Sequence, residues 1–160
     1  MNETVEAAAL ESEIHRDANL DVLISGIPYV RFLGMRFERK GDELTSVLPF
    51  RGILLGNPDP PALHGGAIAA FLEVTALVEL SWRRICDGGD EAMVEENLRK
   101  NPKTIALTAD YLRPGYPRAA YARAHIVRSG RRYATVRVEA WQEKRSRNFA
   151  QATGHFLMPA

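Results

Sequence analysis

The stretch that most constrains the fold is ALHGGAIAAFLEVTALVELS, residues 62–81. After His64, Gly65 and Gly66 it is apolar on nearly every side, which predicts one long helix buried in a core. It is too short and too interrupted to indicate a membrane span. The adjacent glycines allow the backbone to turn closely and another group to approach, because glycine has no side chain.

One acidic residue, Glu73, lies in the middle of this apolar run. A buried carboxylate is costly unless it is paired, hydrogen-bonded or protonated. Its neighbours one turn away are Ala69, Ala70 and Ala76, and these small side chains leave space above the carboxylate. We therefore expect Glu73 to face a ligand; the alternative is that it reaches water or an arginine.

The two glycines supply the second half of a possible site. Unpaired N–H groups at a helix N-terminus favour negative charge, so Gly65 and Gly66 are candidates to hold a developing oxyanion, unless they only form a helix entrance. On one helix Gly65 and Glu73 lie roughly 12 Å apart, at about 1.5 Å of rise per residue. One carbonyl group cannot contact both. If they act together they come from two copies of the chain, which predicts a two-fold dimer with two equivalent interface sites.

Length and composition indicate one globular unit. The chain has 160 residues, 46% of them hydrophobic, which suits a single domain with a sizeable core. We expect a polar helical arm over residues 1–18 and one domain over residues 19–160, without internal repeats.

The charge and the cysteine content limit the classes of partner and the cellular compartment that we expect. The formal net charge is +1, from 21 basic and 20 acidic residues, so nucleic acid is not expected as the main partner. Cys86 is the single cysteine, which excludes an internal disulfide and a cysteine-based zinc cluster and favours a reducing cytoplasm. The acidic N-terminus indicates no export signal, and no membrane contact is expected. His15, His125 and His155 lack metal-ligand spacing, so we expect neither a metal nor a cofactor.

The remaining periodicities predict a sheet built around the helix. Apolar alternation and turn residues predict a hairpin over 35–50 around Gly41, and three successive antiparallel strands after Gly115. Further predicted segments are a short helix over 19–30 interrupted near Gly26, an irregular loop over 51–66, a solvated excursion over 82–103 with a short helix at 91–99, and a strand over 104–114. This order predicts an α+β fold, an antiparallel curved sheet wrapped around one long central helix.

That order, together with LHGGAIAAFLEVTA, ADYLRPGY and VRSGRRYATVRVE, resembles the hotdog-fold acyl-CoA thioesterases, particularly the phenylacetate-pathway (PaaI-like) type. The similarity covers roughly residues 28–158. It implies a hotdog fold, hydrolysis of an acyl-CoA thioester to a free acid and CoA, no cofactor, and a homodimer that can pair further into a tetramer.

The resemblance also assigns roles to residues. Glu73 matches the catalytic carboxylate, which acts as nucleophile or as general base for water. Gly65 matches the residue whose N–H polarises the thioester carbonyl, and His64 the residue that braces the entrance loop. Thr104 falls where the family often has a hydroxyl that orients water, and is otherwise an ordinary strand threonine.

Two positions depart from the family pattern. Family members usually have Asn or Gln six residues before the histidine, where this chain has Pro58; a loop longer by one residue would bring Asn57 to the site instead. A hydroxyl found in some relatives four residues after the carboxylate is replaced by Leu77.

Coenzyme A carries phosphates, which call for cations near the pocket mouth. Arg113, beside Pro114, and the hairpin residues Arg131 and Arg132 are the candidates, although exposed arginines at turns are often only solvated. The run EKRSR at 143–147 is interpreted as a solvated turn.

Other functions stay open at this point. A hotdog domain can be a noncatalytic acyl-CoA-binding module, which Pro58 and Leu77 would suit. It can be an acyl-thioester hydratase or dehydratase, although no catalytic histidine paired with an acid can be placed here. A third possibility is an assembly subunit whose helix serves only packing.

Overall fold

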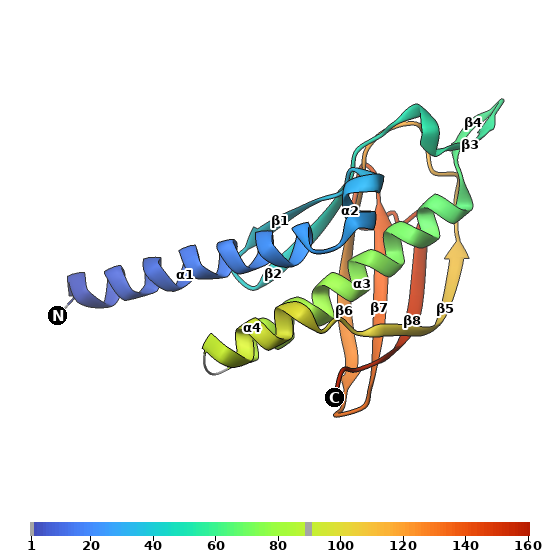
Figure 1. Cartoon of the computed structure of the whole chain (residues 1–160). Coiled ribbons are helices and arrows are strands. Elements are labelled where there is room, and N and C mark those ends of the chain that lie inside the picture. Colours follow the sequence, from blue (N-terminus) through green and yellow to red (C-terminus); the bar gives the residue numbers. More distant parts are fainter. Residues whose placement is uncertain (1, 89–90) are drawn as a thin grey trace.

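A single long helix, α3 (Gly65–Asp87), crosses one face of a curved antiparallel sheet (Figure 1). This computed structural model describes residues 2–88 and 91–160. Six strands form the sheet in the order β1-β2-β6-β7-β8-β5. Their bounds are β1 Arg36–Lys40, β2 Glu43–Leu48, β5 Lys103–Tyr111, β6 Ala120–Ser129, β7 Tyr133–Trp141 and β8 Ala150–Leu157. The predicted α+β layout is confirmed.

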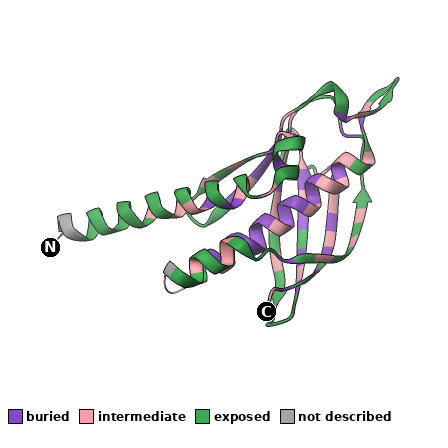
Figure 2. Cartoon of the chain, in the orientation of Figure 1, coloured by how far each residue is buried: buried purple, intermediate pink, exposed green. Residues whose placement is uncertain are grey.

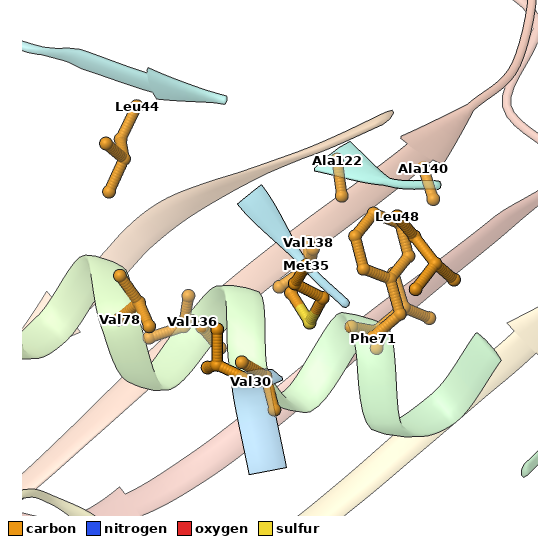
Figure 3. Close-up of a cluster of buried hydrophobic side chains, with 14 of the residues drawn as sticks. Val30, Met35, Leu44, Leu48, Phe71, Val78, Ala122, Val136, Val138 and Ala140 are labelled. Carbon is orange, nitrogen blue, oxygen red and sulfur yellow. The ribbon is translucent and has the colours of Figure 1, made fainter. Parts of the chain in front are cut away.

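Small side chains on the inner face of the sheet let α3 lie close to it. Ser46 pairs with Ala122 and Ala122 with Ala140 across neighbouring strands, and all three residues are buried. Phe71 and Val78 of α3 belong to the same core cluster as Ala122 and Ala140, part of which Figure 3 draws around the helix. Figure 2 shows buried residues concentrated along α3 and the strands beneath it, while the N-terminal helix is mostly exposed.

The predicted strands are present with the expected inward faces. In β7 the buried residues alternate as Ala134, Val136, Val138 and Ala140. The β1–β2 hairpin turns at Gly41, whose φ of 60° lies in the left-handed region that favours glycine. Period-two alternation therefore located the sheet correctly.

The segment over residues 51–66 is more regular than the predicted loop. It contains a short 3₁₀ helix, η1 (Gly52–Leu54), and a small hairpin of β3 (Leu55–Pro58) and β4 (Pro61–Leu63). The hairpin projects beyond the sheet near the start of α3 (Figure 1). The short helix expected over 91–99 is confirmed as α4 (Glu91–Arg99).

Helix α3 continues six residues past the predicted end at Ser81. The charged pair Arg83 and Arg84 suggested a break, but Trp82 and Ile85 are buried and extend the inward face of the helix. By length and composition alone α3 could cross a membrane, yet 61% of its apolar window is buried inside the molecule. Its apolar sequence is thus used for packing in the core.

The N-terminal segment is one continuous helix, α1 (Asn2–Ser25), where the sequence suggested an arm to residue 18 and a separate short helix. The expected interruption occurs at Gly26, and α2 (Pro28–Leu33) follows. The Arg39 guanidinium on β1 donates hydrogen bonds to Glu13 at 2.7 Å and to Asp17 at 2.6 Å. These ion pairs tie the second half of α1 to the sheet.

A second carboxylate in α3, which the sequence reasoning missed, is Glu79. Glu79 is only 6% exposed. Its Oε1 lies 2.9 Å from Nε of Arg83, one helical turn later. Burial raises the pKa of the Glu79 carboxyl, and the Arg83 guanidinium opposes that rise. The internal ion pair that was considered for Glu73 is therefore made by Glu79.

We expect Arg83→Ala to lower the free energy of unfolding by about 2 kcal/mol at neutral pH, because it leaves a buried carboxylate unpaired. The folded-state pKa of Glu79 is already raised, so ionisation of this carboxyl destabilises the fold. The free energy of unfolding lost in Arg83→Ala should therefore grow as pH rises through that pKa. Denaturant titrations from about pH 5 to pH 8 measure it. The Glu79→Gln/Arg83→Ala variant should recover most of the loss without this pH dependence; a single variant as stable as the parent at the upper pH would contradict the pairing.

Candidate active site

The start of α3 carries a free backbone donor. His64 is the N-cap, and its Nδ1 accepts a hydrogen bond from the Gly66 N–H at 2.9 Å. The Gly65 N–H has no acceptor among the described residues. The two glycines therefore differ: Gly66 anchors the histidine, which fits the bracing role expected of His64, and Gly65 presents its N–H at the positive end of the helix.

Two further residues, which the sequence reasoning missed, fix this entrance. The Tyr111 hydroxyl donates to the Gly65 carbonyl at 2.8 Å. A Cβ on Gly56 would lie 2.6 Å from Cα of His64, so only glycine permits the close approach of β3 to the histidine. Tyr111 and Gly65 are 46 residues apart in sequence, so no local pattern signals their contact, whereas Gly56 itself was the local signal of the second one.

Glu73 lies half-buried on the face of α3 that is not covered by the rest of the chain. Gly66, Ala69, Ala70 and Leu77 share this face and are exposed or half-buried. Glu73 has no hydrogen bond or ion pair within the described part of the chain. Its carboxylate is available to a group outside this chain, and α3 keeps it about two turns from Gly65.

The predicted residues divide between the two ends of β5. Tyr111, at one end, contacts the glycine entrance, whereas Thr104 is roughly 23 Å away along the strand at about 3.3 Å per residue. Arg131 and Arg132 lie beside Lys103, at the same end of β5 as Thr104, and line a cavity of about 670 Å³. Within one chain, the structure does not bring these three residues to Gly65.

Asn57 and Arg113 lie at the entrance end. Asn57 is exposed on the β3–β4 hairpin, where its Oδ1 accepts a hydrogen bond from the Asp59 N–H at 3.4 Å. Arg113 follows Tyr111 by two residues and lines a different cavity of about 290 Å³. Asn57 therefore does not contact Glu73 or Gly65 of its own chain.

An apolar hollow of about 200 Å³ adjoins the entrance, where His64 and Gly66 form part of its wall. Tyr29 and Phe32 of α2 line it as a stacked pair, with ring centroids 5.4 Å apart. No group of three or more His, Cys, Asp or Glu side chains suited to a metal lies among the residues that the structure describes. The wall of this hollow beside the start of α3 is thus formed mainly by apolar side chains.

Comparisons with known proteins agree on one family. Residues 57–157 match the family model described as the acyl-CoA thioesterase N-terminal domain. Medium/long-chain acyl-CoA thioesterase YigI of Escherichia coli K12 is 32% identical in an alignment 147 residues long, which covers 86% of this chain and 90% of that protein.

Solved structures agree on the fold. A protein from Shewanella oneidensis related to the thioesterase superfamily is 25% identical, with a TM-score of 0.75 over 94% of this chain and 98% of that one. The Escherichia coli PaaI protein from the phenylacetic acid degradation operon is 14% identical, with a TM-score of 0.71 over 91% of this chain and 94% of that one. The resemblance inferred from the motifs is confirmed, and with it the hotdog fold.

We expect Gly56→Ala to destabilise the fold by about 2 kcal/mol and to reduce thioester hydrolysis, because the new methyl group forces His64 and the helix start to move. Thermal unfolding and a thiol-release assay measure the two effects. Gly52→Ala is the matched control, since a Cβ there meets nothing within 4 Å. Equal behaviour of the two variants would show that the entrance tolerates a shift.

Proposed function

Because the chain belongs to the acyl-CoA thioesterase family, we propose that it hydrolyses an acyl-CoA thioester to a free acid and CoA at a site shared by two copies of the chain. The curated relative is named for medium- and long-chain substrates, and we extend that substrate class to this chain as part of the proposal. Pro58 and Leu77 would suit the noncatalytic binding module, which predicts CoA binding without release of thiol.

The observation that carries the proposal is the geometry of α3. Gly65 presents a free N–H, Glu73 presents an unpaired carboxylate, and a rigid helix keeps them roughly 12 Å apart. Ala69 and Ala70 lie midway between them on the same uncovered face. Two antiparallel copies of α3 that meet at these alanines place Glu73 of each copy beside Gly65 of the other, and the small side chains permit a close approach.

The edge of the sheet supports the same two-fold arrangement. β5 is the last strand of the sheet, and within residues 2–88 and 91–160 it pairs only with β8. Its side chains Ile105 and Tyr111 are 55% and 53% exposed. An unpaired, apolar edge strand is a template for another chain. Antiparallel pairing of two β5 strands about a two-fold axis near Leu107 covers this edge.

Pairing of the two β5 strands also brings together the candidate residues that lie at opposite ends of β5 within one chain. Thr104 of one copy comes beside Tyr111 of the other, since antiparallel strands exchange their ends. The turn that holds Arg131 and Arg132 then lies at the second copy's glycine entrance, where its positive charge favours an anionic CoA ester. The residues that the family resemblance assigns to one site thus belong to two copies.

The reaction follows from the placement of charge. The Gly65 N–H donates to the thioester oxygen and stabilises the negative charge that develops on it. The second copy's Glu73 either attacks the carbonyl carbon, giving an acyl-enzyme anhydride that water then hydrolyses, or takes a proton from the attacking water. In both cases the CoA thiolate leaves, and we assign to Thr104 and Asn57 the role of orienting the water or the thioester.

We expect Glu73→Gln to lower kcat about a thousandfold, because the amide can neither attack nor accept a proton at neutral pH. Thiol release from a medium-chain acyl-CoA measures it, with circular dichroism and gel filtration to verify fold and assembly. Glu95→Gln, at an exposed carboxylate paired with Arg99, is the matched control and should keep its activity. Unchanged turnover of the Glu73 variant would remove this residue from the mechanism.

A further inference from the structure

Two loops at the glycine-entrance end of the sheet enclose a cationic pocket. Arg113 and Arg118 come from the connection between β5 and β6, and Lys144 and Arg147 from the connection between β7 and β8. We call these four residues the cationic cradle. They line a cavity of about 290 Å³.

The cradle is held by a network of hydrogen bonds between the two loops. The Gln142 side chain accepts from the Tyr116 N–H at 2.9 Å and donates to the Tyr116 carbonyl, also at 2.9 Å. The Phe149 carbonyl accepts from the N–H groups of Leu112 at 2.8 Å and Arg113 at 3.1 Å. These bonds fix the backbone of both loops, so an ion would meet positions that are already ordered.

Most of the charge in the cradle is not neutralised. Glu143 pairs with Arg118, while Arg113 donates to the Asn148 carbonyl, which leaves its charge uncompensated. The side chains of Lys144 and Arg147 have no hydrogen-bond or ion-pair partner within the described residues. Convergent guanidinium and ammonium groups of this kind match the geometry and charge of phosphate.

The structure changes the interpretation of the EKRSR run, which the sequence suggested was a solvated turn. Lys144 and Arg147 line the cavity of the cradle. Arg145, between them in sequence, instead stacks over the Trp141 ring, 5.6 Å from its centroid. Arg145 therefore has different surroundings from its neighbours Lys144 and Arg147, and it provides an internal comparison.

The cradle is linked to the predicted reaction centre by direct contacts. Arg113 follows Tyr111, whose hydroxyl bonds to the Gly65 carbonyl. The Leu63 N–H, one residue before His64, donates to the Gly115 carbonyl at 2.8 Å. The β5–β6 connection, which carries Arg113 and Arg118, thus begins beside the start of α3 on the same copy of the chain.

We propose that the cationic cradle binds the nucleotide end of CoA, its diphosphate and ribose 3′-phosphate, while the thioester lies at Gly65 of the same copy. The proposal rests on the proposed function. It adds Arg118, Lys144 and Arg147 to the residues expected to recognise CoA, and it assigns the phosphates mainly to this pocket. Arg131 and Arg132 of the second copy are the competing site.

The test compares two thioesters of one acyl group, octanoyl-CoA and octanoyl-N-acetylcysteamine, which lacks the nucleotide. We expect Lys144→Gln/Arg147→Gln to raise KM for octanoyl-CoA about tenfold with kcat unchanged, since contacts between charged groups are lost. KM for the N-acetylcysteamine ester should not change, and Arg145→Gln should leave both esters unaffected. An unchanged KM for octanoyl-CoA, or an equal rise for both esters, would overturn the proposal.

Two comparisons separate this proposal from its alternatives. If Arg131→Gln/Arg132→Gln alone raises KM for octanoyl-CoA and the cradle variant does not, the phosphates belong to the other cluster. If the unsubstituted protein hydrolyses neither ester, the proposed function fails, and calorimetric titration with CoA itself still tests the cradle. Weaker CoA binding by the cradle variant than by Arg145→Gln would support the cradle, and equal binding would contradict it.

Discussion

A single rigid helix sets the distance on which the site depends. The hydrogen-bonded backbone of α3 holds the free Gly65 N–H and the Glu73 carboxylate roughly 12 Å apart, and no change of rotamer can bring both to one carbonyl group. The core reinforces this separation, because Phe71, Val74 and Val78 pack α3 against the sheet. In the proposed mechanism, these are the two chemical groups of the hydrolase, and only a second copy can join them at one thioester.

The sheet is consistent with the proposed pairing of two copies. Its small inner side chains, among them Ala122 and Ala140, bring α3 close, while β5 is left at the edge with exposed apolar residues. The buried carboxylate Glu79 already has its arginine, so it does not compete with Glu73 for a catalytic role. In the proposed dimer, the helix face and the strand edge that one chain leaves uncovered become one continuous interface.

Local patterns predicted the parts of this structure that depend on local geometry. Alternation identified the strands of the β6–β8 meander, and the glycines with an apolar run identified the start of α3. The end of α3 was predicted too early, at Ser81, because the charged pair Arg83 and Arg84 is typical of a helix boundary. The contacts of Tyr111 with Gly65, and the convergence of Lys144 with Arg118, depend on pairings between distant strands, which no local pattern encodes.

Subunit complementation tests the shared site most directly. Gly65→Pro removes one N–H at the first helical position, where proline is tolerated, and His64, with ψ of 132°, already has the extended conformation that precedes proline. Each variant, Gly65→Pro or Glu73→Gln, should be nearly inactive alone. Equal co-expression makes half of the dimers mixed, each with one intact site, so the account predicts about a quarter of wild-type activity. Activity no greater than the mean of the two separate variants would contradict it.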